Sequence, residues 1–216
     1  MSGSVTSKPL PALFLVGGGG HCLSCIDVIE SAGRFAIVGY VKGSQDGSHQ
    51  LLGYPALGTD ADLAMLVDTH GSALVTVGQI KTAETRARLY EQLIALGAKL
   101  PVVTSPWAQI SMHSTLGDGT IAMHGVVVNA NVRVGRNCII NSQALIEHGT
   151  QVGDHCHIST GARINGDVVV GNGCFIGSGA VIKHGISIGD HALIEAGQVV
   201  LADVPSGTWL RSTHEQ

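Results

Sequence analysis

The stretch NSQALIEHGTQVGDHCHISTGARINGDVVVGNGCFIGSGAVI, residues 141–182, places isoleucine or valine at every sixth position from Ile146 onward. The same step of six runs outward in both directions, from Ile110 to Val200. It meets an aliphatic residue at each position except Ala122. Neither the period of an α-helix nor that of an ordinary β-strand gives this spacing. A six-residue repeat of this kind predicts a parallel β-helix built from hexapeptides.

Three hexapeptides form one triangular coil of such a β-helix, and successive coils pair as parallel strands about 4.8 Å apart. We expect this prism over residues 105–204, with the aliphatic side chains inside. A coil of three hexapeptides stacks Cys138, Cys156 and Cys174 in one inward column. We interpret that column as core packing, unbridged in a reducing compartment, rather than as a metal site. Asp154 and Asp190, in repeated GDH turns, are expected to cap backbone N–H groups.

The histidines of this region fall in different columns of the prism. His148 lies on one outer side, and His155 and His157 lie on the next, so one chain offers no good three-ligand metal site. His184 and His191 share columns with His148 and His155, but two coils, about 9 to 10 Å, separate them. We therefore expect His155, His184 and His191 to be surface residues.

The composition limits the class of protein. The chain has 216 residues and a formal net charge of −4, so it carries no electrostatic footprint for nucleic acid or an anionic membrane. The apolar run ALFLV is too short to span a bilayer, and we expect a cytoplasmic protein with residues 1–10 as a leader. Cys22 and Cys25 form a CxxC without a second pair, and we interpret them as small apolar residues of a helix.

The N-terminal half, residues 11–104, alternates predicted strands and helices and so indicates a small parallel, Rossmann-like α/β domain. ALFLV, IVGYV and SALVTVG are the expected strands, and AETRARLYEQLIALG is a long helix ending near Gly97. GGGGH separates the first strand from the first helix, and backbone N–H groups at such a turn suit a phosphate. Lys42 stands where a dinucleotide site would need an acidic residue, which favours a nucleotide-sugar. Residues 205–216 form a C-terminal tail.

This arrangement resembles a known family. A glycine turn followed by His21, a small α/β domain and hexapeptide repeats are similar to bacterial sugar acyltransferases related to sialic acid O-acetyltransferase. The run EH…GDxxHI, from Glu147 to Ile158, is the most specific part. It is most similar to N-acetyltransferases of nucleotide-linked 4-amino-4,6-dideoxy sugars. The resemblance implies a left-handed β-helix, acetyl-CoA as co-substrate, no metal, and a homotrimer with active sites between subunits. It also implies a role in lipopolysaccharide, O-antigen or other surface glycan synthesis.

The resemblance further implies roles for individual residues. His148 would be the general base, with Asn141 close to it, and His157 would contact acetyl-CoA near the thioester. The CoA groove would be lined by the backbones of Ser178 and Ala196. The nucleotide-sugar would be held by four residues of the N-terminal domain: Gly19, Gly20, His21 and Gly78. The developing oxyanion would be met by a backbone N–H or by His157.

The chain departs from the family pattern at three places. Gly149 stands where a carboxylate often follows the catalytic histidine, and Lys42 with Gly43 replaces an acidic pair. The tail carries Trp209 and Arg211, where stacking on adenine and pairing with phosphate would replace the usual closing motif. Two alternatives remain open at this point. One is O-acetylation of a sialic-acid-type sugar, and the other is a non-catalytic or metal-dependent β-helix protein with histidines meeting across an interface.

Overall fold

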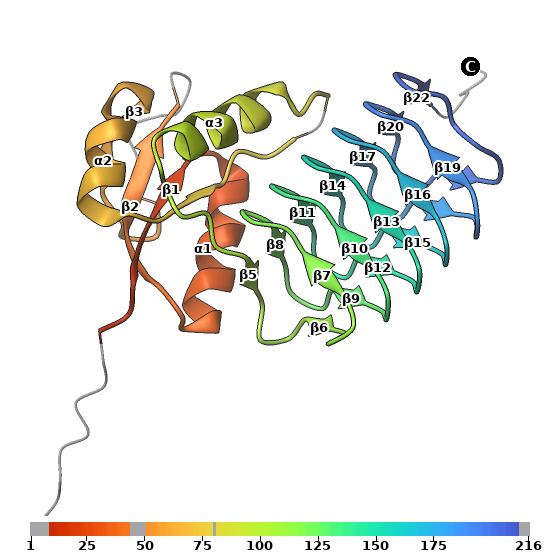
Figure 1. The fold of residues 1–216 in the computed structure, drawn as a ribbon, viewed down its shortest axis with the longest axis horizontal. Coiled ribbons are helices and arrows are strands. Elements are labelled where there is room, and N and C mark those ends of the chain that lie inside the picture. Colours follow the sequence, from red (N-terminus) through yellow and green to blue (C-terminus); the bar gives the residue numbers. More distant parts are fainter. Residues whose placement is uncertain (1–8, 44–50, 80, 212–216) are drawn as a thin grey trace, which may run out of the picture.

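The computed structural model describes residues 9–43, 51–79 and 81–211, and they form an α/β domain followed by a β-helix (Figure 1). The α/β domain lies against the side of the first coils, and the later coils extend beyond it. None of the helices in these three ranges is long and apolar enough to cross a bilayer.

The α/β domain has a four-stranded parallel sheet in the order β3-β2-β1-β4. Its elements in chain order are β1 (Ala12–Val16), α1 (Gly20–Ala32), β2 (Ala36–Lys42), β3 (Ala56–Thr59), a 3-10 turn (Asp60–Asp62), α2 (Leu63–His70), β4 (Ala73–Val75) and α3 (Glu84–Ala95). The three predicted strands and two predicted helices are confirmed as β1, β2, β4, α1 and α3. Gly97 follows the last helix with φ +81°, a left-handed conformation that favours glycine.

The sequence did not reveal β3 or α2. The strand ALGT is a short edge strand of small residues, and α2 has only eight residues. Both elements are shorter than the periodic patterns that identify strands and helices from sequence. Side-chain and backbone hydrogen bonds from Thr59 to Asp62 fix the turn between them.

The β-helix consists of two-residue strands that stack into three parallel sheets. The strands are β5 (Val103–Thr104), β6 (Gln109–Ile110), β7 (Thr115–Leu116), β8 (Ile121–Ala122), β9 (Val127–Val128), β10 (Arg133–Val134), β11 (Ile139–Ile140), β12 (Leu145–Ile146), β13 (Gln151–Val152), β14 (His157–Ile158), β15 (Arg163–Ile164), β16 (Val169–Val170), β17 (Phe175–Ile176), β18 (Val181–Ile182), β19 (Ser187–Ile188), β20 (Leu193–Ile194), β21 (Val199–Val200) and β22 (Trp209–Leu210). Pairs such as Ile140 with Ile158 confirm the predicted coil. The hexapeptide pattern ended at Val200, whereas β22 pairs with β20, so the prism takes in the start of the expected tail.

The three sheets of the prism have different surroundings. The seven-stranded sheet from β5 to β22 is named the covered face, because α1 packs against its first strand, β5. The six-stranded sheet from β6 to β21 is named the apolar face, and its outward side chains include Val127, Leu145, Val181 and Val199. The five-stranded sheet from β7 to β19 is named the polar face.

The cysteines belong to the core, as predicted. Cys22 and Cys25 are buried on α1 in the same apolar cluster as Ile121 and Ile139 of the covered face. Cys138, Cys156 and Cys174 are buried in one column, and all five thiols are free. Each thiol of the column donates a hydrogen bond to the carbonyl of a glycine fifteen residues later, at 3.0 to 3.1 Å.

Candidate functional site

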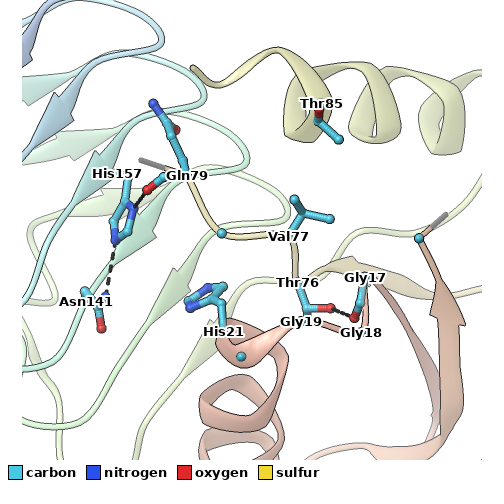
Figure 2. Close-up of a pocket in the computed structure, with 13 residues that line it drawn as sticks. Gly17, Gly18, Gly19, His21, Thr76, Val77, Gln79, Thr85, Asn141 and His157 are labelled. Atoms are coloured by element: carbon cyan, nitrogen blue, oxygen red, sulfur yellow. Dashed lines mark hydrogen bonds between the residues drawn. The ribbon is translucent and has the colours of Figure 1, made fainter. Parts of the chain in front are cut away.

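A pocket of about 660 Å³ lies between the N-terminal turn of α1 and the covered face. The α/β domain contributes residues 17–21, Gly43, residues 76–79 and Thr85, and the β-helix contributes Asn141 and His157 (Figure 2). This pocket contains all four residues expected to hold a nucleotide-sugar, which are Gly19, Gly20, His21 and Gly78. It also contains Asn141 and His157, two of the residues expected near the acetyl group of acetyl-CoA.

The glycine turn leaves the start of α1 open. Gly17 has φ +117°, and a Cβ there would lie 2.6 Å from the Val77 side chain, so only glycine fits. Thr76 donates from Oγ1 to the carbonyl of Gly17 at 2.8 Å and holds the turn. Gly19 is the N-cap of α1 and has no side-chain cap, and the first turn contains no acidic residue. The positive end of a thirteen-residue helix therefore faces the pocket, where it suits an anionic group.

His157 points outward from the prism, but the α/β domain covers it and leaves it 7% exposed. Its Nδ1 lies 2.8 Å from the backbone carbonyl of Gln79, which can only accept, so Nδ1 carries the proton. Burial lowers the pKa of His157 to about 3, so the ring is neutral at physiological pH and Nε2 is an acceptor. The expectation that His157 could donate to an oxyanion is therefore wrong for this arrangement, because its one N–H is already used.

Asn141 is held by two hydrogen bonds. Its Nδ2 donates to Nε2 of His157 at 3.2 Å (Figure 2). Its Oδ1 accepts from the N–H of Ser142 at 2.8 Å. The two partners fix which end of the amide faces which neighbour. One hydrogen of Nδ2 is left at the pocket wall.

His21 is the second neutral histidine of the pocket. Burial lowers its pKa to about 4, and the positive charge of Arg86 acts in the same direction. Its Nε2 lies 3.4 Å from Sγ of Cys25, one helical turn further along α1. The rings of His21 and His157 are 6.2 Å apart, centre to centre. Gly78 passes close to His21, and a Cβ there would lie 3.3 Å from that of His21.

His148 lies in a different hollow, of about 580 Å³, which is lined by Asn165, Lys183, Leu201 and other residues of the apolar face and its edge. The His148 ring lies over Gly166, where a Cβ would come within 2.6 Å of Cε1. Its centre is 6.4 Å from that of the exposed His184, which is closer than two coils because Gly166 separates them without a side chain. One chain alone therefore does not bring His148 together with Asn141. These residues occupy turns at opposite edges of the apolar face.

The carboxylate that the resemblance leads us to expect directly after His148 is absent from the chain there, but Asp167 lies beside that position. Gly149 has φ +71°, and a Cβ there would overlap Oδ1 of Asp167 from the next coil. The Asp167 backbone N–H donates to the carbonyl of His148 at 2.9 Å. Asp167 thus fills the space that a side chain at Gly149 would occupy.

Ser178 and Ala196 lie in the column of turns that also contains Asn141 and Ser142. The backbone N–H groups of Thr160, Ser178 and Ala196 have no acceptor in the described ranges of the chain. The turns between the polar and covered faces differ in this respect. There the N–H of Arg136 donates to Asp154 and that of Asn172 donates to Asp190, at 2.7 and 2.6 Å. The capping role predicted for the two aspartates is confirmed, and of these two columns of turns it is the Ser178 column that keeps open donors.

The remaining predicted residues have varied surroundings. His184 and His191 are exposed, as expected. His155 is only 16% exposed, because Tyr90 of α3 packs edge-on against its ring at 5.5 Å, so the prediction of a surface residue was wrong there. Trp209 donates from Nε1 to Glu195 at 3.0 Å, and the guanidinium of Arg211 stacks 3.5 Å above its ring.

Sequence reasoning missed part of the pocket. Thr76, Gln79 and Thr85 line it, and Arg86 lies behind it, yet none carries a motif. Their places depend on how α3 and the preceding loop dock on the prism, which no local pattern records. Within the three described ranges, no group of three or more His, Cys, Asp or Glu is arranged to hold a metal ion.

Comparison with family models identifies both parts of the chain. Residues 12–93 match the PglD N-terminal domain. Residues 113–148 match the bacterial transferase hexapeptide, and residues 167–202 match the hexapeptide repeat of succinyl-transferase. Comparison with curated proteins gave no match.

Solved structures extend the similarity to nearly the whole chain. PerB from Caulobacter crescentus, in complex with CoA and GDP-perosamine, is 30% identical with a TM-score of 0.85, covering 93% of this chain and 94% of that one. The acetyltransferase domain of PglB from Neisseria gonorrhoeae, with acetyl coenzyme A, is 28% identical with a TM-score of 0.84, covering 92% and 95%. WeeI from Acinetobacter baumannii, at 23% identity, TM-score 0.80 and coverage of 94% and 98%, shares the fold. This chain belongs to the sugar N-acetyltransferases that join a PglD-type N-terminal domain to a left-handed hexapeptide β-helix.

Proposed function

We propose that this enzyme transfers the acetyl group of acetyl-CoA to the amino group of a nucleotide-linked amino-dideoxy sugar of the 4-amino-4,6-dideoxy type. The observation that carries the proposal is the pocket itself, which joins the open N-terminus of α1 to Asn141 and His157 of the β-helix. The relatives solved with GDP-perosamine and CoA support the same substrate classes. We place the reaction in the cytoplasm, in the synthesis of a surface glycan.

The nucleotide-sugar occupies the α/β side of the pocket in this proposal. Its diphosphate lies at the N-terminus of α1, where the N-cap Gly19 has no side chain to compete with it. The sugar then extends past His21 toward Asn141. Gly43 lines the same pocket, so the chain offers no carboxylate at the family's acidic pair. That difference points to a nucleotide base or sugar held mainly by backbone groups.

Acetyl-CoA follows the column of turns from Asn141 to Ala196. The open N–H groups of Thr160, Ser178 and Ala196 are spaced one coil apart, about 4.8 Å. Amide carbonyls along the pantetheine chain are acceptors that such donors can bind. This is the support for the groove assigned to Ser178 and Ala196.

A second copy of the chain completes the site. The apolar face lies between the turn of Asn141 and the turn of His148, and it ends in Val199 and Leu201, which are 61% and 65% exposed. Packing this face against a neighbour would bury that apolar surface and bring the His148 of one copy to the pocket of another. The proposed assembly is a homotrimer.

The chemistry needs a base and an oxyanion donor. The amino nitrogen attacks the thioester carbonyl and forms a C–N bond, His148 takes the nitrogen-bound proton, and the C–S bond breaks to release CoA with that proton on sulfur. A backbone N–H or Asn141 would stabilise the oxyanion in between. The five cysteines are buried, so none serves as a covalent acyl carrier.

The direct test is a panel of nucleotide-linked sugars with acetyl-CoA, followed by the release of free thiol. The panel contains 4-amino, 3-amino and hydroxyl sugars, together with a sialic-acid-type sugar. We expect thiol release with a 4-amino sugar and an acetamide product by mass spectrometry. Turnover of the hydroxyl sugar alone would instead establish O-acetylation. The absence of turnover with every amino sugar would reject the proposal.

A further inference from the structure

Arg86 is a buried cation that belongs to neither substrate surface. It lies on α3, is 1% exposed, and bonds to both parts of the molecule. Its guanidinium donates to the backbone carbonyls of Asn137 and His155, which occupy the same position in successive coils. In return, the Asn137 side chain donates to the carbonyl of Arg86 at 3.2 Å. Arg86 therefore fastens α3 to the prism.

The third partner of Arg86 leads to the pocket. Nη2 donates to Oε1 of Gln79 at 2.6 Å, and Nε2 of Gln79 donates to the carbonyl of Gly173, one coil beyond His155, at 3.2 Å. Gln79 is 3% exposed, so both ends of its side chain are bonded in the interior. The backbone carbonyl of Gln79 is thereby fixed, and it is this carbonyl that accepts from Nδ1 of His157.

The Gln79 carbonyl then sets the direction of the hydrogen bonds that continue through His157 to Asn141. A fixed acceptor at Gln79 places the proton of His157 on Nδ1, which makes Nε2 the acceptor for Asn141. Ser142 holds the other end of the Asn141 amide. The hydrogen bonds from Gln79 through His157 to Asn141 therefore run in one direction, and the second N–H of Asn141, which lines the pocket, has no acceptor within the described ranges.

The burial of Arg86 has no evident advantage for stability. A buried guanidinium is costly to desolvate, and a well-packed apolar side chain of similar size is often as stable or more so. Arg86 also keeps an unsatisfied group, because its Nε has no hydrogen-bond partner in the described parts of the chain. Retention of such a group in a packed interior suggests that it has a task other than packing.

We propose that Arg86 and Gln79 are positioning residues that hold His157 in the Nδ1–H tautomer and thereby direct the free amide N–H of Asn141 at the acetyl carbonyl oxygen. Asn141 is the catalytic donor in this arrangement, and His157 is the acceptor that orients it. This inference deepens the proposed function and rests on it for the identity of the acyl group. It assigns no proton transfer to His157.

The first test removes the donor. Asn141→Asp keeps the shape but replaces the amide N–H groups with oxygen, and we expect kcat to fall by about 10² to 10³, the effect of losing one oxyanion donor. The KM for the nucleotide-sugar should change little. Asn131→Asp, at an exposed turn outside the pocket, is the matched control and should keep full activity. An Asn141→Asp enzyme with kcat near that of the wild type would overturn the assignment.

The second test examines Arg86 without relying on turnover. Nitrogen-15 NMR of His157 should show one Nδ1–H tautomer in the wild type and a mixture in a folded Arg86→Met variant. Arg86→Lys, which cannot reach three acceptors at once, provides a second variant if the methionine protein does not fold. A single unchanged tautomer in either folded variant would overturn the positioning role. If no amino sugar is a substrate, the proposed function fails. The NMR measurement still tests, independently of turnover, whether Arg86 and Gln79 fix the tautomer of His157.

Discussion

His157 and His21 lie 6.2 Å apart, ring centre to ring centre, at the wall of the pocket, and burial keeps both rings uncharged at neutral pH. An uncharged imidazole can orient a neighbour through one donor and one acceptor. It does not bring a positive charge to the pocket. The exposed His148 is in a different setting, because its ring faces an open hollow at the edge of the apolar face.

The two buried histidines make stability depend on pH. Their pKa values of about 3 and about 4 lie below the value of about 6.5 for an unfolded histidine, so the unfolded chain binds protons that the folded chain does not. Their contribution to the free energy of unfolding is present above about pH 6.5, and it is lost as the pH falls toward 4 for His21 and toward 3 for His157. Between pH 6 and 5, where the unfolded histidine completes its protonation, each should lower the free energy of unfolding by about 1 kcal/mol. Urea unfolding at several pH values gives the free energy of unfolding as a function of pH, and His21→Asn should make this dependence less steep. An equal pH dependence in the two proteins would contradict the burial argument.

His148→Asn should reduce turnover by about 10² to 10⁴, the range for losing a general base. The fold should be unaffected, because His148 is exposed and asparagine keeps its backbone hydrogen bond to Glu147. Steady-state kinetics on the same nucleotide-sugar measures the effect. His191→Asn, at another exposed turn, is the control and should remain fully active. A His148→Asn enzyme within a few fold of the wild type would show that the base is elsewhere.

Single residues were predictable only where a motif marked them. His148, His157 and the glycine turn became candidates through the resemblance that the EH…GDxxHI run carries, and the structure places His157 and the glycine turn in one pocket. Gln79 and Arg86 were not, because an arginine on an amphipathic helix is normally solvated. That His157 would be buried also escaped prediction, since its place in the prism is an outward one and only the docked α/β domain covers it.

At the scale of elements, the N-terminus of α1 is the simplest feature to test. Gly19 has extended backbone angles, and no atom lies within 4 Å of a Cβ built there, so a larger residue fits. Gly19→Glu places a carboxylate where the diphosphate is expected, whereas Gly19→Gln has the same size without the charge. We expect the KM for the nucleotide-sugar to rise about tenfold or more for the glutamate alone, with little change for acetyl-CoA. Equal effects of the two variants would place the phosphates elsewhere.

The cysteine column is a structural element with its own prediction. Thr120 precedes the three thiols in that column, and its hydroxyl donates to the carbonyl of Gly135 just as Cys156 donates to that of Gly171. Cys156→Ser keeps a donor and should cost about 1 kcal/mol in urea unfolding, with full activity. Cys156→Val leaves the Gly171 carbonyl without this donor and should cost more. Loss of activity in a folded serine variant would reveal a chemical role for the thiol.

Helices and strands were predictable from the sequence where their apolar residues recur at a regular spacing. The step of six identified each coil strand from β6 to β21, because every coil must direct an aliphatic side chain inward. It could not identify β5 and β22, where the pattern is interrupted and only pairing with a neighbour defines the strand. The strand β3 and the helix α2 are too short for a repeating pattern of apolar residues to identify them.

At the scale of the whole molecule, the two halves of the proposed site lie on opposite edges of one face. The sequence indicated a prism and an α/β domain, but it did not indicate that Asn141 and His157 would join the glycine turn in one pocket. That arrangement depends on the interface fastened by Arg86, whose contacts join residues about fifty and seventy positions apart. His148 remains separate from this pocket in one chain, which is why the account requires a second copy.

The most direct test of this account mixes two impaired enzymes at a nucleotide-sugar concentration far below the KM of Gly19→Glu, where each variant alone has little turnover. His148→Asn lacks the base but keeps the pocket, and Gly19→Glu keeps the base but blocks the pocket. In a mixed trimer, some sites combine an intact pocket from one copy with an intact His148 from the next. Random assortment of equal amounts should restore about one quarter of wild-type turnover. A mixture no more active than either variant alone would contradict a site shared between subunits.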